Sequence, residues 1–200
     1  MESRLGILSS GSHHYKEQHA KGLELLSLME EELLGSHPSR TTTPMGRPEY
    51  ADFKADFNIS HAGNLVICTM ADGGTGCDIE LATRKVNPSV AEKFFHPEEK
   101  DYLADAKTQE ESRKRFLTLW VLKEAHIKLI GTTVGAVRET PSFSVRGNRI
   151  ICQADNGIYY SLYEGGGYVM AAAFERKEDR DNLIIRKYGE APDFTLTAVN

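Results

Sequence analysis

The sequence predicts an α+β fold made of two halves that pack as one unit. Three observations support this prediction. A helix and several strands come first along the chain, and a helical region followed by further strands comes second. The 200 residues are 40% hydrophobic, which suits one compact unit or two small halves that share a core. No flexible linker separates the halves, which we place at residues 1–88 and 89–200, meeting near 84–92.

The first half begins with a short strand around residues 5–9 and a helix of roughly 20 residues over about 16–34. Gly35 is a typical residue for the end of this helix. The polar segment 36–48 contains TTTP and GRP and indicates a loop. The apolar residues that keep helical spacing are Leu23, Leu26, Met29 and Leu33.

Strands follow this loop. DFNIS (56–60) predicts a short strand, and NLVICTMA (64–71) predicts a buried one. The glycine-rich DGGTG (72–76) then leads into CDIEL (77–81). Two strands joined by such a turn indicate a hairpin between 64–71 and 77–81.

The second half opens with a helical region that starts near Pro88 and includes VAEKFFHPEEKDYL. A long helix is expected over about 110–130. The remaining strands form a predicted meander with RGN, DNG and GGG at its turns. These strands are SFSV, RIICQA, IYYSLYE and YVMAAAF.

Composition excludes several classes of protein. The net charge is −5 and no block of lysines and arginines occurs, so a nucleic-acid partner is not expected. Cys68, Cys77 and Cys152 form no CxxC pair, which disfavours a zinc site or a disulfide framework and favours buried thiols in a reducing compartment. The sequence shows no signal-peptide pattern and no apolar run of membrane-spanning length, so we expect a cytoplasmic protein without a membrane partner.

Two acidic residues of the predicted strand 77–81 share one face. The period of two places Asp78 and Glu80 together, and Cys77 on the opposite face. Same-face neighbours lie roughly 7 Å apart, close enough for both to reach one hard cation. An edge strand with its acidic face in water is the alternative interpretation of this motif alone.

The long helix carries charges where burial is expected. From residue 116 to 130 apolar side chains cover most of the circumference, yet Lys123 falls within the apolar stripe. Glu124 and Lys128 lie one turn apart and would form an ordinary i,i+4 ion pair, but this pair leaves Lys123 unexplained. Unpaired charges in such a helix are costly, and a metal with phosphate groups would compensate the set. His126 alone is typical of a hydrogen-bonded core histidine.

Two further stretches are suited to an anion, although each is a weak signal alone. Ser60 and His61 lie where a strand precedes Ala62-Gly63, so a hydroxyl and an imidazole are presented near a turn. Arg47, between Gly46 and Pro48, places a guanidinium on a stiff loop, which fits a phosphate.

Together and in this order, these motifs resemble the 4′-phosphopantetheinyl transferases of the longer, surfactin-synthetase type. The resemblance covers about residues 16 to 175. Its two strong motifs, G-x-D-I-E and W-x-x-K-E-A-x-x-K, occur about 40 residues apart. The matching stretches are GRP (46–48), FNISHAG (57–63), GCDIE (76–80), FFHPEEKDYL (94–103), WVLKEAHIK (120–128) and SFSV (142–145).

The resemblance implies a pseudo-dimer of two similar α+β halves, with coenzyme A bound in the cleft between them. It implies a Mg²⁺ site formed by Asp78, Glu80 and Glu124, and oxygen-only ligands suit this ion. Cys77 stands where valine or isoleucine is usual, and its side chain is expected to point away from the metal.

The resemblance also implies which residues contact the coenzyme. Lys123 and Lys128 would face its phosphates, with Arg47, Ser60 and His61 as further contacts. Lys16 and Lys21, at the start of the first helix, are the candidates for the 3′-phosphate.

The function implied is transfer of 4′-phosphopantetheine from coenzyme A to a serine of an apo acyl, peptidyl or polyketide carrier protein. The products would be the holo carrier and 3′,5′-ADP, and we expect a monomeric enzyme. Glu124 or a metal-bound water would take the serine proton. The alternatives are a Mg-dependent nucleotide phosphodiesterase or phosphohydrolase, and a non-catalytic carrier-binding module of the same fold.

Overall fold

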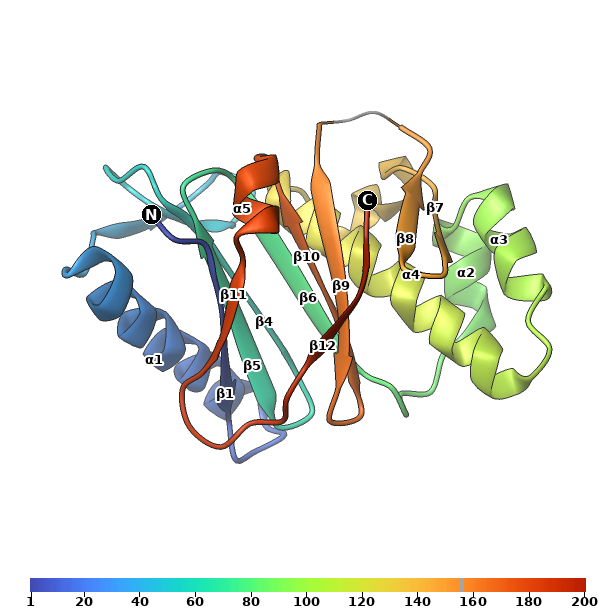
Figure 1. Ribbon diagram of the computed structural model, residues 1–200, viewed down its shortest axis with the longest axis horizontal. Helices are drawn as coiled ribbons and strands as arrows, with labels where there is room; N and C mark the ends of the chain where they lie inside the picture. The colour runs from blue at the N-terminus through green and yellow to red at the C-terminus, as the bar shows by residue number, and fades with distance from the viewer. Residues whose placement is uncertain (155–156) are drawn as a thin grey trace.

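Two β-sheets pack face to face, and each carries a long helix on its outer face (Figure 1). The computed structural model describes residues 1–154 and 157–200. The layers are therefore helix, sheet, sheet and helix, which confirms the α+β class predicted from the sequence.

The first sheet has the strand order β11-β1-β5-β4. Its strands are β11 (Ile184–Lys187), β1 (Arg4–Ser9), β5 (Leu65–Ala71) and β4 (Asp56–Ala62). Alternation along β1 and β5 divides their side chains between two cores. Leu5 and Ile67 pack toward the second sheet, whereas Val66 and Met70 pack toward helix α1 (Tyr15–Leu34).

Helix α1 lies close against β1 because Gly6 has no side chain. A Cβ at Gly6 would lie 2.5 Å from the sulfur of Met29. The helix ends as predicted at Gly35, whose left-handed conformation (φ 62°) and N–H bond to the Glu31 carbonyl close the last turn. The expected helix is thus confirmed. Leu23, which was expected on its apolar face, is exposed, and Leu25 is buried instead.

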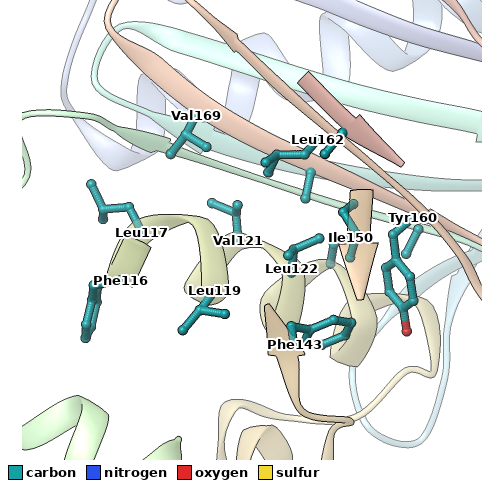
Figure 2. Close-up of a cluster of buried hydrophobic side chains, with 14 of the residues drawn as sticks. Phe116, Leu117, Leu119, Val121, Leu122, Phe143, Ile150, Tyr160, Leu162 and Val169 are labelled. Carbon is teal, nitrogen blue, oxygen red and sulfur yellow. The ribbon is translucent and has the colours of Figure 1, made fainter. Parts of the chain in front are cut away.

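The second sheet has the order β6-β10-β9-β12-β8-β7. Helix α4 (Gln109–Leu129) covers its outer face, and Figure 2 shows the apolar side chains between helix and sheet. The expected burial of the long helix is confirmed, since most residues from Phe116 to Leu129 are buried. The strands are β6 (Thr75–Leu81), β10 (Tyr168–Phe174), β9 (Tyr159–Gly165), β12 (Thr195–Val199), β8 (Arg149–Cys152) and β7 (Phe143–Arg146).

The helical region predicted from Pro88 onward divides into α2 (Pro88–Phe94) and α3 (Pro97–Ala104). Pro97 disfavours a helical conformation at the preceding residue, so His96 is extended and forms a capping box with Glu99. The remaining short elements are β2 (Arg40–Thr42), β3 (Pro48–Tyr50), the 3₁₀ helix η1 (Val134–Glu139) and α5 (Lys177–Asp181).

The predicted hairpin between residues 64–71 and 77–81 is wrong. Strand β5 already has β1 and β4 on its two sides, so DGGTG (72–76) carries the chain to the other sheet, where β6 pairs with β10. The chain therefore changes sheets between Ala71 and Thr75, before the expected boundary at 84–92. At the end of the chain, β11 returns to the first sheet and β12 enters the second.

Both sheets contain the same local topology. In each, a strand is followed by the covering helix and later by a hairpin, and the first strand pairs with the second hairpin strand. The two series are β1, α1, β4, β5 and β6, α4, β9, β10. The predicted strands of the meander are confirmed, but β12 separates β8 from β9, so their order is not that of a meander. The turn expected at DNG (155–157) falls partly on residues 155 and 156, outside the described residues.

Cys68 and Cys77 are buried, as predicted, and Cys152 is half-buried. In the part of the chain that the structure describes, no helix has the length and apolar character needed to cross a bilayer.

Candidate active site

Four of the predicted site residues lie together where the edges of the two sheets meet beneath α4: Ser60, Asp78, Glu124 and Lys128. Strand β4 ends the first sheet and β6 ends the second. Asn58 on β4 links them, because its side-chain oxygen accepts a hydrogen bond from the Cys77 N–H on β6 at 3.0 Å. We call this place the seam.

Gly76 brings α4 directly onto the seam. A Cβ at Gly76 would lie 2.2 Å from the Ala125 carbonyl oxygen of α4, so only glycine permits this contact. Asp78 and Glu80 follow on the same face of β6 and are therefore presented toward the helix. Cys77 faces the opposite way, into the core between the sheets, as predicted, and burial raises the pKa of its thiol to about 11.

Asp78 lies at the centre of the seam. Its Oδ1 accepts hydrogen bonds from the Ser60 hydroxyl at 2.8 Å and from the Lys128 ammonium at 2.5 Å. Lys128 also donates to Ser60 at 3.0 Å, which closes a three-residue network between β4, β6 and α4. Asp78 Oδ2 is buried without a hydrogen-bond partner among the described residues. A buried carboxylate oxygen in this condition has capacity for one more donor or for a cation.

Glu124 lies one helical turn before Lys128 and is also buried. Burial, followed by the nearby charge of Asp78, raises the pKa of Glu124 to about 7. No hydrogen bond or ion pair joins its carboxylate to another described residue. Burial acts to lower the pKa of Lys128, but Asp78, Cys77 and Glu124 together outweigh it, so this pKa is raised. The charge of one ammonium thus acts on two carboxylates but is bonded only to Asp78, and a second cation would relieve the repulsion between Asp78 and Glu124.

Glu80 is held away from this network by a salt bridge to Arg84, just beyond the end of β6. Among residues 1–154 and 157–200, no three His, Cys, Asp or Glu side chains are arranged so that they could hold a metal ion. Asp78 and Glu124 nevertheless fit Mg²⁺, because their donors are carboxylate oxygens and one buried oxygen of Asp78 lacks a partner. Glu80 would have to leave Arg84 to join them.

His61 lies beside the seam but on the face of β4 that is turned to α1. Its ring meets the Tyr15 ring edge-on at a centroid distance of 5.5 Å. Burial, and then the charge of Lys128, lowers the pKa of His61, so it is predominantly neutral at pH 7. Lys16 is exposed on the first turn of α1, and Lys21 pairs with Glu24 at 2.7 Å. These two lysines lie on the outer helix rather than on β6 or α4.

Arg47 makes internal contacts. Its guanidinium donates to both oxygens of Asp56, to the Lys128 carbonyl at 2.8 Å and to the Thr75 carbonyl at 2.9 Å. These bonds tie the loop before β3 to β4, β6 and the end of α4. The geometry therefore favours a structural role for Arg47 over the predicted phosphate contact.

Lys123 is not brought to the seam. Its side chain and that of Glu99 are both 0% exposed, and their charged atoms lie 3.0 Å apart. The ammonium also donates to the Thr140 hydroxyl at 2.9 Å. Glu99 in turn accepts from the backbone N–H groups of His96 and Phe143. The predicted phosphate contact of Lys123 has no support in this arrangement.

Sequence reasoning missed the partners of these basic residues. Glu99 occurs three residues after His96, which is capping-box spacing and could have indicated its burial. No local signal indicated that Arg84 pairs with Glu80. His126 is confirmed as a core histidine, since its Nδ1 lies 2.7 Å from the hydroxyl of Tyr160.

Comparison with known proteins places this site in a family. Residues 74–180, from the start of β6 to α5, match the family model described as the 4′-phosphopantetheinyl transferase superfamily. The chain is 32% identical to the 4′-phosphopantetheinyl transferase Sfp of Bacillus subtilis over 158 residues, covering 75% of this chain and 69% of Sfp. It is 38% identical over 86 residues to the 4′-phosphopantetheinyl transferase gsp of Aneurinibacillus migulanus, covering 43% of this chain and 35% of gsp.

The chain belongs to the 4′-phosphopantetheinyl transferase superfamily, a family of transferase enzymes. The resemblance seen in the sequence is therefore confirmed. The matched part spans 35% of gsp, and 31% of a third relative, the transferase psf-1 of Bacillus pumilus.

Proposed function

We propose that this protein transfers the 4′-phosphopantetheine arm of coenzyme A to a serine hydroxyl of an apo carrier protein, with Mg²⁺ as cofactor. The observation that carries the proposal is the seam itself. There Lys128 is bonded to the buried Asp78, its charge also acts on the buried Glu124, and one Asp78 oxygen has no hydrogen-bond partner among the described residues. The names of the relatives, all 4′-phosphopantetheinyl transferases, support the same reaction.

In the proposed reaction the serine oxygen attacks the β-phosphorus of coenzyme A. The phosphorus–oxygen bond to the nucleotide breaks, and 3′,5′-ADP leaves. Asp78 and Glu124 would hold Mg²⁺, with Glu80 as a third ligand, and the bound ion would stabilise negative charge on the pyrophosphate oxygens. Lys128 presents a positive charge at the same place, where charge develops in the transition state.

Glu124 is the proposed general base. Before a cation binds, its pKa of about 7 is close to the pH at which a base must accept a proton. Coordination of Mg²⁺ would lower the basicity of this carboxylate, so a water at the cation is the alternative base for the serine proton. Ser60 would orient Asp78 and Lys128 through the hydrogen bonds that it makes to both.

The coenzyme is proposed to lie in a cleft between the two halves. The repeated strand, helix and hairpin topology supports a pseudo-dimer, and the seam draws its residues from both sheets. His61, Lys16 and Lys21 remain the candidates for the outer phosphates. We also propose that the enzyme is monomeric and that it is cytoplasmic, the latter on the sequence grounds given above.

Incubation with coenzyme A and Mg²⁺, with and without apo carrier proteins, tests the proposal. Transfer adds a phosphopantetheine group of about 340 Da to the carrier, visible in its intact mass. Hydrolysis of the coenzyme without a carrier would instead identify a phosphodiesterase or phosphohydrolase. Binding of a carrier with neither reaction would identify a binding module. A panel of acyl, peptidyl and polyketide carriers would define the acceptor.

A further inference from the structure

Arg84 lies three residues beyond Leu81, the end of β6. It forms a salt bridge with Glu80, whose side chain is 14% exposed, while its own side chain is 48% exposed. The positive charge of Arg84 also acts on Glu124, opposing the effect of burial on that carboxyl. The charge of Arg84 therefore acts on Glu80 and Glu124, two of the three carboxylates that are proposed to bind the cation.

The basic residues of the seam supply the charge that a divalent cation would bring. Lys128 is bonded to Asp78, and Arg84 is bonded to Glu80. Together they place two positive charges among three carboxylates. A cation can reach the unpartnered oxygen of Asp78 and the carboxylate of Glu124 directly, but to bind Glu80 as well it must displace Arg84.

Displacement is easier at Arg84 than at Lys128. A half-exposed ion pair contributes little stability, because water screens it and the free guanidinium is well hydrated. Lys128 is bonded to both Asp78 and Ser60 and is held more firmly. Once released, a guanidinium can bind phosphate through two parallel hydrogen bonds.

We infer that Arg84 is an internal counter-ion that occupies Glu80 until a divalent cation replaces it, and that the released guanidinium then binds a phosphate group of the substrate. The inference rests on the proposed function, since it takes Asp78, Glu80 and Glu124 as cation ligands. It assigns Arg84 two opposite effects. Arg84 weakens cation binding in the absence of substrate and strengthens substrate binding when the cation is present.

The test measures Mn²⁺ binding to the full chain by electron paramagnetic resonance, without coenzyme. Arg84→Gln is expected to bind Mn²⁺ roughly two- to fivefold more tightly than the wild type, the range expected for loss of an exposed ion pair. Lys85→Gln is the matched control. It removes the same charge one residue away, and Lys85 forms no ion pair with another described residue, so a smaller change is expected. An Arg84→Gln affinity equal to that of Lys85→Gln would overturn the counter-ion role.

Coenzyme A binding at saturating Mn²⁺ tests the second effect. Arg84→Gln should bind the coenzyme about tenfold more weakly, the loss expected for a charge-assisted phosphate contact, whereas Lys85→Gln should bind as the wild type does. Unchanged binding in Arg84→Gln would overturn the phosphate contact. Asp78→Asn separates this inference from the proposed function. If Asp78→Asn binds Mn²⁺ as tightly as the wild type, the cation site itself is misassigned.

Discussion

Two lysines five residues apart on α4 have opposite surroundings. Lys123 is 0% exposed and lies between Glu99, the Thr140 hydroxyl and the Pro141 carbonyl. Lys128 is 26% exposed and is bonded to Asp78 and Ser60 at the seam. We call the first arrangement the closed pair and the second the open pair.

The difference shows how a structural charge can be distinguished from a functional one in the same helix. In the closed pair, Glu99 bonds two backbone N–H groups in addition to Lys123, so its charge is fully compensated within the protein. In the open pair, Asp78 keeps a buried oxygen and Glu124 a buried carboxylate that no other side chain in residues 1–154 and 157–200 bonds. Incomplete compensation is costly to the fold and is expected where a ligand completes the set.

The largest effect is expected from breaking the closed pair. Lys123→Met leaves the Glu99 carboxylate buried without its counter-ion, which should lower the free energy of unfolding by about 3–5 kcal/mol. Chemical denaturation measures this change. The double variant Lys123→Met/Glu99→Gln should recover part of the loss, because no unpaired charge remains. A single variant within 1 kcal/mol (roughly the worth of an exposed pair) of the wild type would contradict the closed pair.

A second prediction uses His126, which lies on the closed side of the helix. Burial, reinforced by the charge of Lys123, lowers the pKa of His126 to about 4. The unfolded chain binds a proton near pH 6.5 and the folded chain does not, so stability is present above this pH and is lost as the pH falls toward 4. The loss is on the order of 3 kcal/mol when complete.

Denaturation at several pH values, comparing the wild type with His126→Gln, measures this contribution. The variant should show a smaller decrease in stability between pH 6.5 and 4, because glutamine does not titrate. Parallel pH profiles for the two proteins would show that His126 is not the group responsible.

The smallest effect on stability is expected at the open pair. Lys128→Met removes the ammonium of a side chain that is 26% exposed, and Ser60 still donates to Asp78, so the free energy of unfolding should fall by about 1–2 kcal/mol, less than for Lys123→Met. Mg²⁺ should raise the melting temperature of this variant more than that of the wild type, because the competing ammonium is gone. If Lys128→Met lowered the free energy of unfolding as much as Lys123→Met does, the proposed difference between the open and closed pairs would be contradicted.

Local signals in the sequence accounted for most of the elements. Apolar spacing and Gly35 predicted α1, and the nearly continuous apolar surface after Phe116 predicted the buried part of α4. Pairing between distant strands was not predictable in the same way. The hairpin expected at DGGTG failed because the partner of β6 lies about 90 residues further along the chain, in β10. Strands β11 and β12 were not anticipated, because short exposed strands carry little alternation.

Part of the candidate site was predictable, because the periodicity of a strand alone decides on which face each side chain lies. The two-residue repeat correctly placed Asp78 and Glu80 on one face of β6, away from Cys77. The partner of each lysine was not predictable, because Lys123 binds Glu99 and Lys128 binds Asp78, and both carboxylates are distant in the sequence. The helix pattern showed that Lys123 was buried but gave no indication of Glu99, which belongs to another helix.

The most direct test compares phosphopantetheine transfer by Asp78→Asn with transfer by the double variant Lys123→Met/Glu99→Gln, by intact mass of the carrier. Circular dichroism first verifies that both proteins are folded. If the open pair forms the active site, Asp78→Asn should lose a hundredfold or more in rate, on the order expected when a stabilising transition-state contact is removed, while the double variant retains most of its activity. Near wild-type transfer by Asp78→Asn, or an equal loss in the folded double variant, would contradict this assignment.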